Sequence, residues 1–596
     1  MTYPSELELD VVLRDGEVVH LRPIRPDDAD LERRFFAHVS PDSSYFRFFR
    51  YKRELTDQEL AYFVTVDYRD RMAFVALAGE EMIAVGRYDL LETENGRRVA
   101  EVAFLVEDRF QGRGVGTLLL QHLAFYARLH DIAAFRAFVL SDNRSMLNVF
   151  RDSGYEVVRE DLRRGIYELE LDTSYSDQAR TADAGREQKA TAASLDALFR
   201  PRSVAVIGAS RDEDSIGGRL LGNLLMTGFR GPVYPINPSA DVVRSVKAYP
   251  SVLDVPGPVD LALIVVPASA AVSVVEECAL KGVKAVVVIS AGFAETGPAG
   301  IRLEAQLLDV VREGGMRMVG PNCMGLLNTD PDVRLNAQFG PVFPPAGNVA
   351  MSSQSGALGL AILDYAREIN IGISSFVSVG NKADVSGNDL LLYWEDDPDT
   401  DVILLYLESF GNPRRFARLA RRIGRKKPIA AVKSGRSATG ARAAASHTGS
   451  LANVEVAVEA LFRQTGVIRV DTLNELFDVT ALLANQPVPG GRRVAVLTNA
   501  GGPAVLCADV LEAEGLDLPT LSEELQARLR KHLPAEASTR NPIDMIGSAG
   551  PEQYEACLRE LLGSDEADAV IVIYIPATPG GGARVAEAIR GIAHQA

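Results

Sequence analysis

A glycine-rich turn near residue 112 is the part of the sequence whose spacing most directly indicates binding chemistry. It consists of Gln111, Gly112, Arg113, Gly114, Val115 and Gly116. Alternating glycines let successive backbone N–H groups point into one concavity, and the dipole of a following helix adds positive charge there. The pattern predicts a diphosphate site at the start of a helix near Val115, with Arg113 as a further charged contact. A plain turn before a helix is the alternative.

A second turn follows the apolar segment 203–207 and consists of Gly208, Ala209 and Ser210. The next glycines stand at 217 and 218, so the spacing departs from the G-x-G-x-x-G pattern of dinucleotide sites. The following apolar segment ends in Asn237-Pro238, where an NAD site would have an acidic residue for the ribose. The turn therefore disfavours a nicotinamide cofactor and remains compatible with a CoA moiety.

The overall composition indicates a folded multidomain protein. A chain of 596 residues is too long to fold around one hydrophobic core. At about 100–200 residues per domain, three to five domains are expected. Its 63 Lys and Arg against 80 Asp and Glu give a net charge of −17, which disfavours nucleic acid and anionic membrane as partners. The four cysteines lie far apart, so neither a metal site nor a disulfide framework is predicted. Without a signal or membrane-spanning pattern, a cytoplasmic location is expected.

Apolar strands alternate with helical segments along most of the chain, which predicts an α/β multidomain fold with parallel sheets. A polar, small-residue-rich stretch over 173–194 is the predicted linker after a first domain at 1–172. Further boundaries are expected after 326 and 486, the second at a Pro/Gly break. The last unit, 487–596, is expected to be incomplete.

Residues 1–172 resemble the GNAT acyltransferase family. The glycine turn fits its Q-x-x-G-x-G motif, LRPIRPDDA at 21–29 is similar to its opening strand and turn, and VLSDNRSMLNVFRDSGYEVV at 139–158 is similar to its closing segment. The resemblance implies a GNAT α/β domain that takes acetyl-CoA as its donor. No metal is predicted.

The same resemblance implies the catalytic groups. The strand before the glycine turn would be splayed from its neighbour, so that backbone N–H groups at Phe104, Leu105 and Val106 hold the thioester carbonyl. Glu101 matches the glutamate that deprotonates the acceptor amine, because a lysine with a pKa of about 10.4 must lose a proton before it attacks. A solvated carboxylate at the strand edge is the alternative for Glu101.

The closing segment carries one match and one departure. Asn143 stands where the family has its cofactor-side asparagine. Seven residues later many members have a tyrosine that protonates the leaving thiolate, and this sequence has Phe150. Because a thiol with a pKa of about 8.5 leaves well unassisted, release to solvent without an acid is expected.

Residues 195–596 resemble the NDP-forming acyl-CoA synthetases, the superfamily of succinyl-CoA synthetase. The matching stretches, in order, are FRPRSVAVIGAS, VVISAGFAETG, VGPNCMGLLN, SSQSGALG, VGNKADVSGNDLL, LYLESFGNPRRF, SHTGSLA and STRNPIDM. The resemblance implies a Rossmann-like CoA-binding domain at 195–326 and flavodoxin-like succinyl-CoA-synthetase-type domains at 327–486 and 487–596.

In that superfamily a histidine carries phosphate between acyl phosphate chemistry and a nucleotide bound on an ATP-grasp domain. His447 matches the histidine and Glu408 its carboxylate partner, and the backbone amides of Ser353, Gln354, Ser355 and Gly356 are the expected phosphate cradle. An idle, retained loop residue is the alternative for His447. No ATP-grasp domain is discernible, so we expect that ligation cannot run on this polypeptide alone.

A GNAT domain joined to such a module is similar to the Pat-type bacterial protein lysine acetyltransferases. This similarity implies a protein substrate, namely the active-site lysine of an AMP-forming acyl-CoA synthetase, and a ligase-like module that senses acetyl-CoA or assists homo-oligomerisation. The first alternative is an ADP-forming acetate or acyl-CoA ligase with its ATP-grasp part elsewhere. The second is a catalytically idle CoA-sensing regulator.

Overall fold

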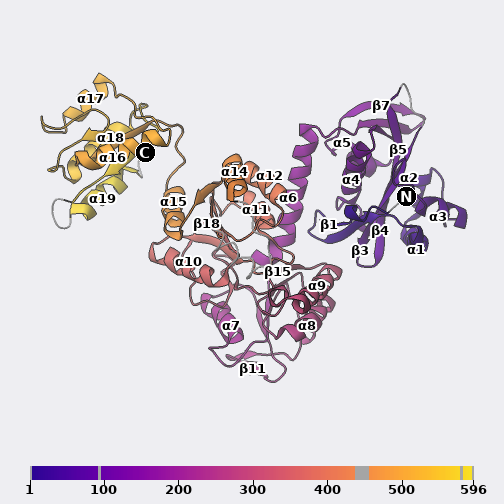
Figure 1. Ribbon diagram of the computed structural model, residues 1–596. Helices are drawn as coiled ribbons and strands as arrows, with labels where there is room; N and C mark the ends of the chain where they lie inside the picture. The colour runs from indigo at the N-terminus through magenta and orange to yellow at the C-terminus, as the bar shows by residue number, and fades with distance from the viewer. Residues whose placement is uncertain (1–2, 92–95, 436–454, 577–580, 594–596) are drawn as a thin grey trace. The chain divides into compact units, whose positions relative to one another are not determined.

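The computed structural model describes residues 3–91, 96–435, 455–576 and 581–593 (Figure 1). The chain divides into two compact units, residues 1–484 and 485–596. The first unit contains three large sheets and a two-stranded ribbon, and the second contains a single three-stranded sheet. The protein is an α/β multidomain protein, as the sequence predicts. Of the helices in the described segments, none is both long and apolar enough to cross a membrane.

An eight-stranded sheet forms the amino-terminal domain. In spatial order its strands are β1 (Leu9–Val12), β2 (Val18–Pro23), β3 (Arg71–Ala78), β4 (Glu81–Leu90), β5 (Arg98–Val106), β6 (Ile132–Leu140), β8 (Ile166–Asp172) and β7 (Val157–Arg163). All neighbouring pairs are antiparallel except β5–β6, which is parallel. The sheet is therefore mixed, with its one parallel junction near the middle.

Helices cover both faces of this sheet (Figure 1). They are α1 (Ala29–His38), α2 (Pro41–Phe48), α3 (Asp57–Val64), α4 (Val115–Leu129) and α5 (Arg144–Arg151). Alternate residues of β5 point to opposite faces, so Leu105 joins the core under α1 whereas Phe104 joins the core under α4. The two adjacent positions of one strand thus serve two separate cores.

The strands β5 and β6 pair over four residues and then separate. Their register runs from Arg98 opposite Ile132 to Glu101 opposite Arg136. Beyond Glu101, β5 continues to Val106 and remains paired with β4, whereas β6 pairs onward with β8. The splay that the family resemblance implies is therefore present, and it opens at Glu101.

The predicted linker lies largely in a long helix, α6 (Asp177–Phe199). Ser176 caps it, its hydroxyl accepting a hydrogen bond from the N–H of Ala179 at 3.2 Å. The helix is rich in alanine, which has the highest helix propensity, and its buried side chains are mostly small until Leu195 and Leu198. A segment without apolar periodicity therefore folds as a helix because small residues pack closely.

A five-stranded parallel sheet follows α6. In spatial order its strands are β10 (Val233–Ile236), β9 (Val204–Ile207), β13 (Leu261–Ile264), β14 (Ala285–Val288) and β15 (Arg317–Val319). The carboxyl-terminal part of α6 and α7 (Ile216–Thr227) pack on one face, and α8 (Ala268–Lys281) and α9 (Pro298–Glu313) on the other. This is the doubly wound arrangement expected from buried, continuous apolar strands.

A seven-stranded sheet completes the first unit. In spatial order its strands are β17 (Leu335–Gln338), β16 (Gly325–Asn328), β19 (Ile373–Ser378), β18 (Ala346–Ser353), β20 (Val402–Leu407), β21 (Ile429–Lys433) and β22 (Ile468–Val470). Its helices are α10 (Gly356–Glu368), α11 (Gly387–Glu395), α12 (Pro413–Ile423), α14 (Glu455–Thr465) and α15 (Leu473–Asn485). The strands β19, β18, β20, β21 and β22 are parallel, so their carboxyl ends meet at one edge.

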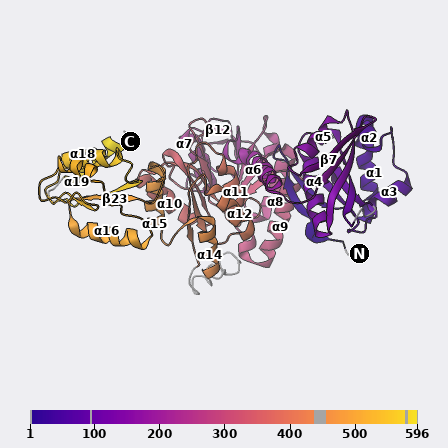
Figure 2. The same ribbon diagram turned by 90° about the horizontal axis from the view of Figure 1, so that it is seen from above.

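The second unit has the sheet order β24 (Ile543–Asp544), β23 (Val494–Thr498) and β25 (Ala569–Ile573). Its helix α16 (Gly501–Ala513) packs on one face. The helices α17 (Glu523–Arg530), α18 (Pro551–Leu562) and α19 (Gly581–Ala593) pack on the other. Figure 2 shows α18 and α19 on the side of β23 opposite α16. This unit is again a small α/β layer structure with parallel strands.

Candidate functional site

The glycine turn leads directly into α4, as the sequence predicts. Gly112 and Gly114 have φ angles of 77° and 94°, in the left-handed region where a side chain is disfavoured, and Gly114 is the residue before the first turn of the helix. Left-handed residues alternating with ordinary ones turn consecutive N–H groups toward one point. The backbone of 111–116 therefore has the form of an anion-binding nest at a helix N-terminus.

Side chains from α2 brace this turn. Gln111 donates hydrogen bonds to the Ser43 hydroxyl at 2.9 Å and the Val106 carbonyl at 3.1 Å. The hydroxyls of Ser40 and Ser43 donate to Asp108 at 2.7 and 2.8 Å. Burial alone would raise the pKa of Asp108, but these hydrogen bonds outweigh it and lower that pKa. Both the side chain of Gln111 and its backbone N–H, which donates to the Asp108 carbonyl at 3.2 Å, thus hold the loop in shape.

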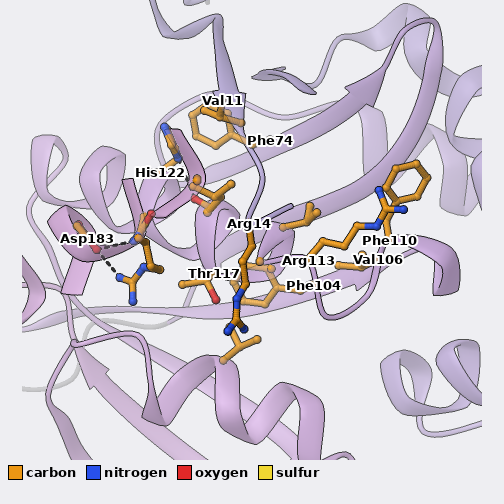
Figure 3. A pocket seen from close by; sticks show the side chains of 18 of the residues that line it. Val11, Arg14, Phe74, Phe104, Val106, Phe110, Arg113, Thr117, His122 and Asp183 are labelled. Carbon is orange, nitrogen blue, oxygen red and sulfur yellow. Dashed lines mark hydrogen bonds and ion pairs between the residues drawn. The ribbon is translucent and has the colours of Figure 1, made fainter. Parts of the chain in front are cut away.

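Two arginines lie beside the turn, and they differ in what they contact. The Arg113 guanidinium pairs with Glu17 and with Asp15 at 3.3 Å, and lies over the Phe110 ring at 4.8 Å. Arg14 is exposed, and its backbone N–H donates to the Arg113 carbonyl at 3.0 Å. Figure 3 shows Arg14 reaching into the cavity beside Thr117, whereas Arg113 extends toward Phe110. Arg14 is therefore the arginine whose charge is available to a diphosphate.

A cavity of about 1600 Å³ runs along the splay and past the glycine turn to α6. It is larger than the roughly 300–1,000 Å³ of an ordinary small-molecule site. The predicted residues that line it are Glu101, Phe104, Leu105, Val106, Gln111, Gly112, Arg113, Gly114, Val115, Gly116 and Asn143. The fold therefore brings together all the residues that the sequence assigns to the acetyl-CoA end.

Glu101 stands where the splay opens. It is half-buried, lies opposite Asp89 of β4 and Arg136 of β6, and its carboxylate forms no hydrogen bond or ion pair with any other described residue. Arg136 pairs instead with Glu168 and Glu170. The carboxylate of Glu101 is therefore unoccupied within the cavity, as a base that receives a proton from an acceptor amine must be.

The donor end has two further features. Asn143 caps α5, with its side-chain oxygen accepting a hydrogen bond from the N–H of Met146 at 3.1 Å. Phe150 is buried and meets Phe104 edge-to-face, with ring centroids 6.0 Å apart. The ring of Phe150 fills the core beside the splay and offers no proton to a leaving group.

The turn after β9 is built for close packing. Gly208 has a φ of 95°, and a methyl group on Gly217 would lie only 2.0 Å from the Gly208 carbonyl oxygen. The side chain of Asn237, at the end of β10, donates to the Ala209 carbonyl at 2.8 Å. Asn237 therefore holds the turn, where an acidic residue would hold a ribose in an NAD site.

The second group of predicted residues lies at the carboxyl edge of the seven-stranded sheet. Ser355 caps α10, and the Ser353 hydroxyl accepts from the Ser355 N–H at 3.2 Å. The Gln354 side chain accepts from the N–H groups of Glu408 and Ser409 at 2.8 and 2.9 Å. The cradle and Glu408 are thus brought together. His447 lies outside the described residues.

Two lysines beside Glu408 were missed by the sequence analysis. The Lys382 ammonium donates to the Ser409 hydroxyl, and the Lys433 ammonium donates to the Ser434 carbonyl at 2.6 Å. Burial lowers the pKa of both lysines, although the negative charge of Glu408 acts in the opposite direction. Two cations around one carboxylate, Lys433 buried and Lys382 half-buried, lie next to a helix N-terminus and give the edge the character of an anion site.

Comparison with known families matches four segments of the chain. Residues 31–155 match the Acetyltransferase (GNAT) family, 202–329 the CoA binding domain, 346–483 the succinyl-CoA ligase like flavodoxin domain, and 494–587 the Ligase-CoA domain. These matches confirm the predicted order of a GNAT domain followed by CoA-binding and succinyl-CoA-synthetase-type domains. CoA or acetyl-CoA is therefore a substrate of this chain.

Individual relatives resemble different parts of the chain. The alpha subunit of ADP-forming acetate–CoA ligase I from Pyrococcus furiosus is 45% identical over 385 residues, 64% of this chain and 83% of the relative. The structure of the dinucleotide forming acetyl-coenzyme A synthetase 1 of Ca. Korarchaeum cryptofilum, in complex with phosphate and ADP, is 44% identical, with a TM-score of 0.64 over 67% of this chain and 86% of that one. Acetyltransferase Pat of Mycolicibacterium smegmatis is 33% identical over 162 residues, 27% of this chain and 48% of the relative.

Proposed function

We propose that this chain is a protein lysine acetyltransferase. It belongs to the family of ADP-forming acetate–CoA ligases and carries a GNAT domain ahead of the ligase domains. In this proposal the GNAT domain moves an acetyl group from acetyl-CoA to a lysine of a protein, and the target is an AMP-forming acyl-CoA synthetase. The ligase domains form a regulatory module that binds CoA compounds. The relation to acetyltransferase Pat supports this choice of acceptor.

The observation that carries the proposal is the free carboxylate of Glu101 at the opening of the splay. Acetyl-CoA is held with its diphosphate on the backbone of 111–116 and its thioester carbonyl against the unpaired edge of β5. Glu101 takes a proton from the lysine ammonium, and the neutral amine attacks the carbonyl carbon. N–H groups of the β5 edge stabilise the oxyanion. The carbon–sulfur bond then breaks, CoA leaves as a thiolate, and the nitrogen of the new amide loses its remaining extra proton to solvent.

The test is acetyl transfer from labelled acetyl-CoA to a purified AMP-forming acetyl-CoA synthetase. Glu101→Gln keeps the size of the side chain and removes its basicity, so kcat should fall by about 100-fold or more while the KM for acetyl-CoA stays close to that of the wild type. Glu80→Gln, at an exposed position between β3 and β4, is the matched control and should be fully active. Transfer that is unaffected by Glu101→Gln would remove Glu101 from the mechanism.

A second candidate function is the ligase half-reaction, and the cluster of Lys382, Lys433 and Glu408 favours it. In this reaction phosphate attacks the acetyl-CoA carbonyl, so that acetyl phosphate forms and CoA leaves as the thiol. It requires no nucleotide, so it can be measured with the chain alone. Formation of labelled acetyl phosphate from labelled phosphate and acetyl-CoA, abolished by Lys433→Met, is the expected result. With no labelled product, the module is a binding domain only.

A further inference from the structure

A half-buried arginine, Arg47, stands in the same cavity as Glu101. Arg47 belongs to the last turn of α2, four residues after Ser43, so both side chains lie on one face of that helix. Ser43 is fixed to the glycine turn through Gln111 and Asp108, and both Ser43 and Arg47 line the large cavity. The position of Arg47 relative to the donor loop is therefore set by the same contacts that brace the loop.

The guanidinium of Arg47 has no polar partner among the residues that the structure describes. It lies over the ring of Phe48, 5.2 Å from the ring centre. Neighbouring arginines differ in this respect, since Arg87 pairs with Glu32 at 2.7 Å and Arg71 pairs with Asp89 at 2.6 Å. Arg47 is thus a cation whose hydrogen-bonding capacity is unused in a region where other guanidinium groups are satisfied.

Several aromatic side chains surround Arg47. Phe46, Phe49 and Phe104 line the cavity with it. Burial, reinforced by the positive charge of Arg87, lowers the pKa of Arg47 to about 10. A guanidinium in such surroundings is a strong partner for a planar anion, because it offers a two-pronged donor set and is not fully hydrated.

The carboxylates facing Arg47 from neighbouring elements are Glu32 of α1, Asp89 of β4 and Glu101 of β5. Glu32 pairs with Arg87 through Oε1, and Asp89 pairs with Arg71. Glu32 Oε2 has no hydrogen bond among the described residues, but neither carboxylate pairs with Arg47 or lines the large cavity. Glu101 is free, but in the proposed mechanism it faces the acceptor amine. The acceptor end of the cavity therefore presents one unengaged cation and one unengaged anion, a pattern complementary to an amine with a carboxylate close by.

We propose that Arg47 binds a carboxylate of the acceptor, so that the preferred acceptor carries an acidic group near the amine that is acetylated at Glu101. This inference rests on the proposed acetyl transfer to an amine. The carboxylate has two sources, namely the side chain of an Asp or Glu beside a lysine in a protein, and the α-carboxylate of a free amino acid.

The test uses the full chain, labelled acetyl-CoA and two end-blocked peptides with a single lysine, flanked by Asp and Glu in one and by Asn and Gln in the other. The wild type should acetylate the acidic peptide with a kcat/KM about 10- to 100-fold higher, the range expected for a hydrogen bond between charged groups. Arg47→Gln should remove this preference through KM, and leave the neutral peptide almost unchanged. Arg47→Lys should keep part of it, because an ammonium retains the charge and loses the planar fork.

Two further arms separate the alternatives. Free lysine has an α-carboxylate, and lysinamide has a neutral amide in its place. If the wild type prefers lysine to lysinamide, and Arg47→Gln loses this preference but shows no change with the two peptides, Arg47 binds a small acceptor. Arg53→Gln, at an exposed position after α2, is the matched control and should keep the wild-type preference. An equal fall in kcat/KM for both peptides would overturn the inference and make Arg47 a structural residue. If Arg47→Gln fails to fold, Arg47→Lys provides the same comparison. Absence of transfer to every amine by the wild type would instead refute the proposed function itself.

Discussion

The assignment of Arg14 to the diphosphate makes a quantitative prediction. Arg14 approaches the glycine turn so closely that a methyl group on Gly114 would lie 3.9 Å from the Arg14 Cβ, and its guanidinium has no ion pair among the described residues. Two unit charges about 4 Å apart interact by about 1 kcal/mol in water and about 4 kcal/mol at an effective dielectric of 20. Because Arg14 is exposed, we expect the lower part of this range, about 1–2 kcal/mol, for its contact with the diphosphate.

Arg14→Gln should therefore lower kcat/KM for acetyl-CoA by about 5- to 30-fold, mainly by raising KM. The assay compares acetyl-CoA with S-acetyl-pantetheine, which has the same thioester and lacks the diphosphate and nucleotide. Acetyl-pantetheine should react equally well with the wild type and Arg14→Gln, and the deficit with acetyl-CoA should shrink at high salt. Arg34→Gln, at an exposed position of α1, is the control. An equal loss with both donors would refute the contact, because it would show that Arg14 acts on the fold of the loop and not on the diphosphate.

Two other predictions follow from buried charges. Arg87→Met removes the cation paired with the buried Glu32, so the free energy of unfolding of the GNAT domain should fall by about 3–5 kcal/mol. The double variant with Glu32→Met should recover most of this loss in calorimetry, and equal melting of the single and double variants would contradict the reasoning. Because the pKa values of Lys382 and Lys433 are lowered, the unfolded chain binds more protons than the folded one between those values and about 10.4. In that window the free energy of unfolding should rise with pH, and the affinity for phosphate should fall. Calorimetric titration would detect both trends, and the double variant Lys382→Met with Lys433→Met should flatten them.

Much of the architecture could be predicted because local sequence specifies it. The glycine turn is followed by a helix that begins at Val115, and the apolar segment 203–207 contains β9 (Val204–Ile207), followed by the turn at Gly208. In each case a strand pattern, a left-handed glycine and a helix pattern occur consecutively, and each constrains the next. Helix α6 was not predicted, because its buried face uses alanine, threonine and serine, which carry no apolar periodicity.

The charged residues that sequence reasoning missed share a different cause. Arg14 and Arg47 reach the cavity from β1–β2 and α2, about 100 and 65 residues before the glycine turn, so only the assembled sheet brings them there. Lys382 and Lys433 follow β19 and end β21, and they meet Glu408 because the strand order is β19-β18-β20-β21. Strand order depends on long-range packing, and no local pattern records it. A search for lysines at the ends of parallel strands would have found both as candidates.

The ring of Phe150 has a consequence for which donors the site accepts. With no proton offered at that position, bond cleavage depends on how stable the departing anion is by itself. A thiolate, with a conjugate acid of pKa about 8.5, departs readily, whereas an alkoxide, comparable to hydroxide with a conjugate acid near 15.7, does not. An oxygen-ester analogue of acetyl-CoA would thus occupy the cavity and persist there as an inhibitor. The site would then tell donors apart by the reactivity of one bond rather than by their shape.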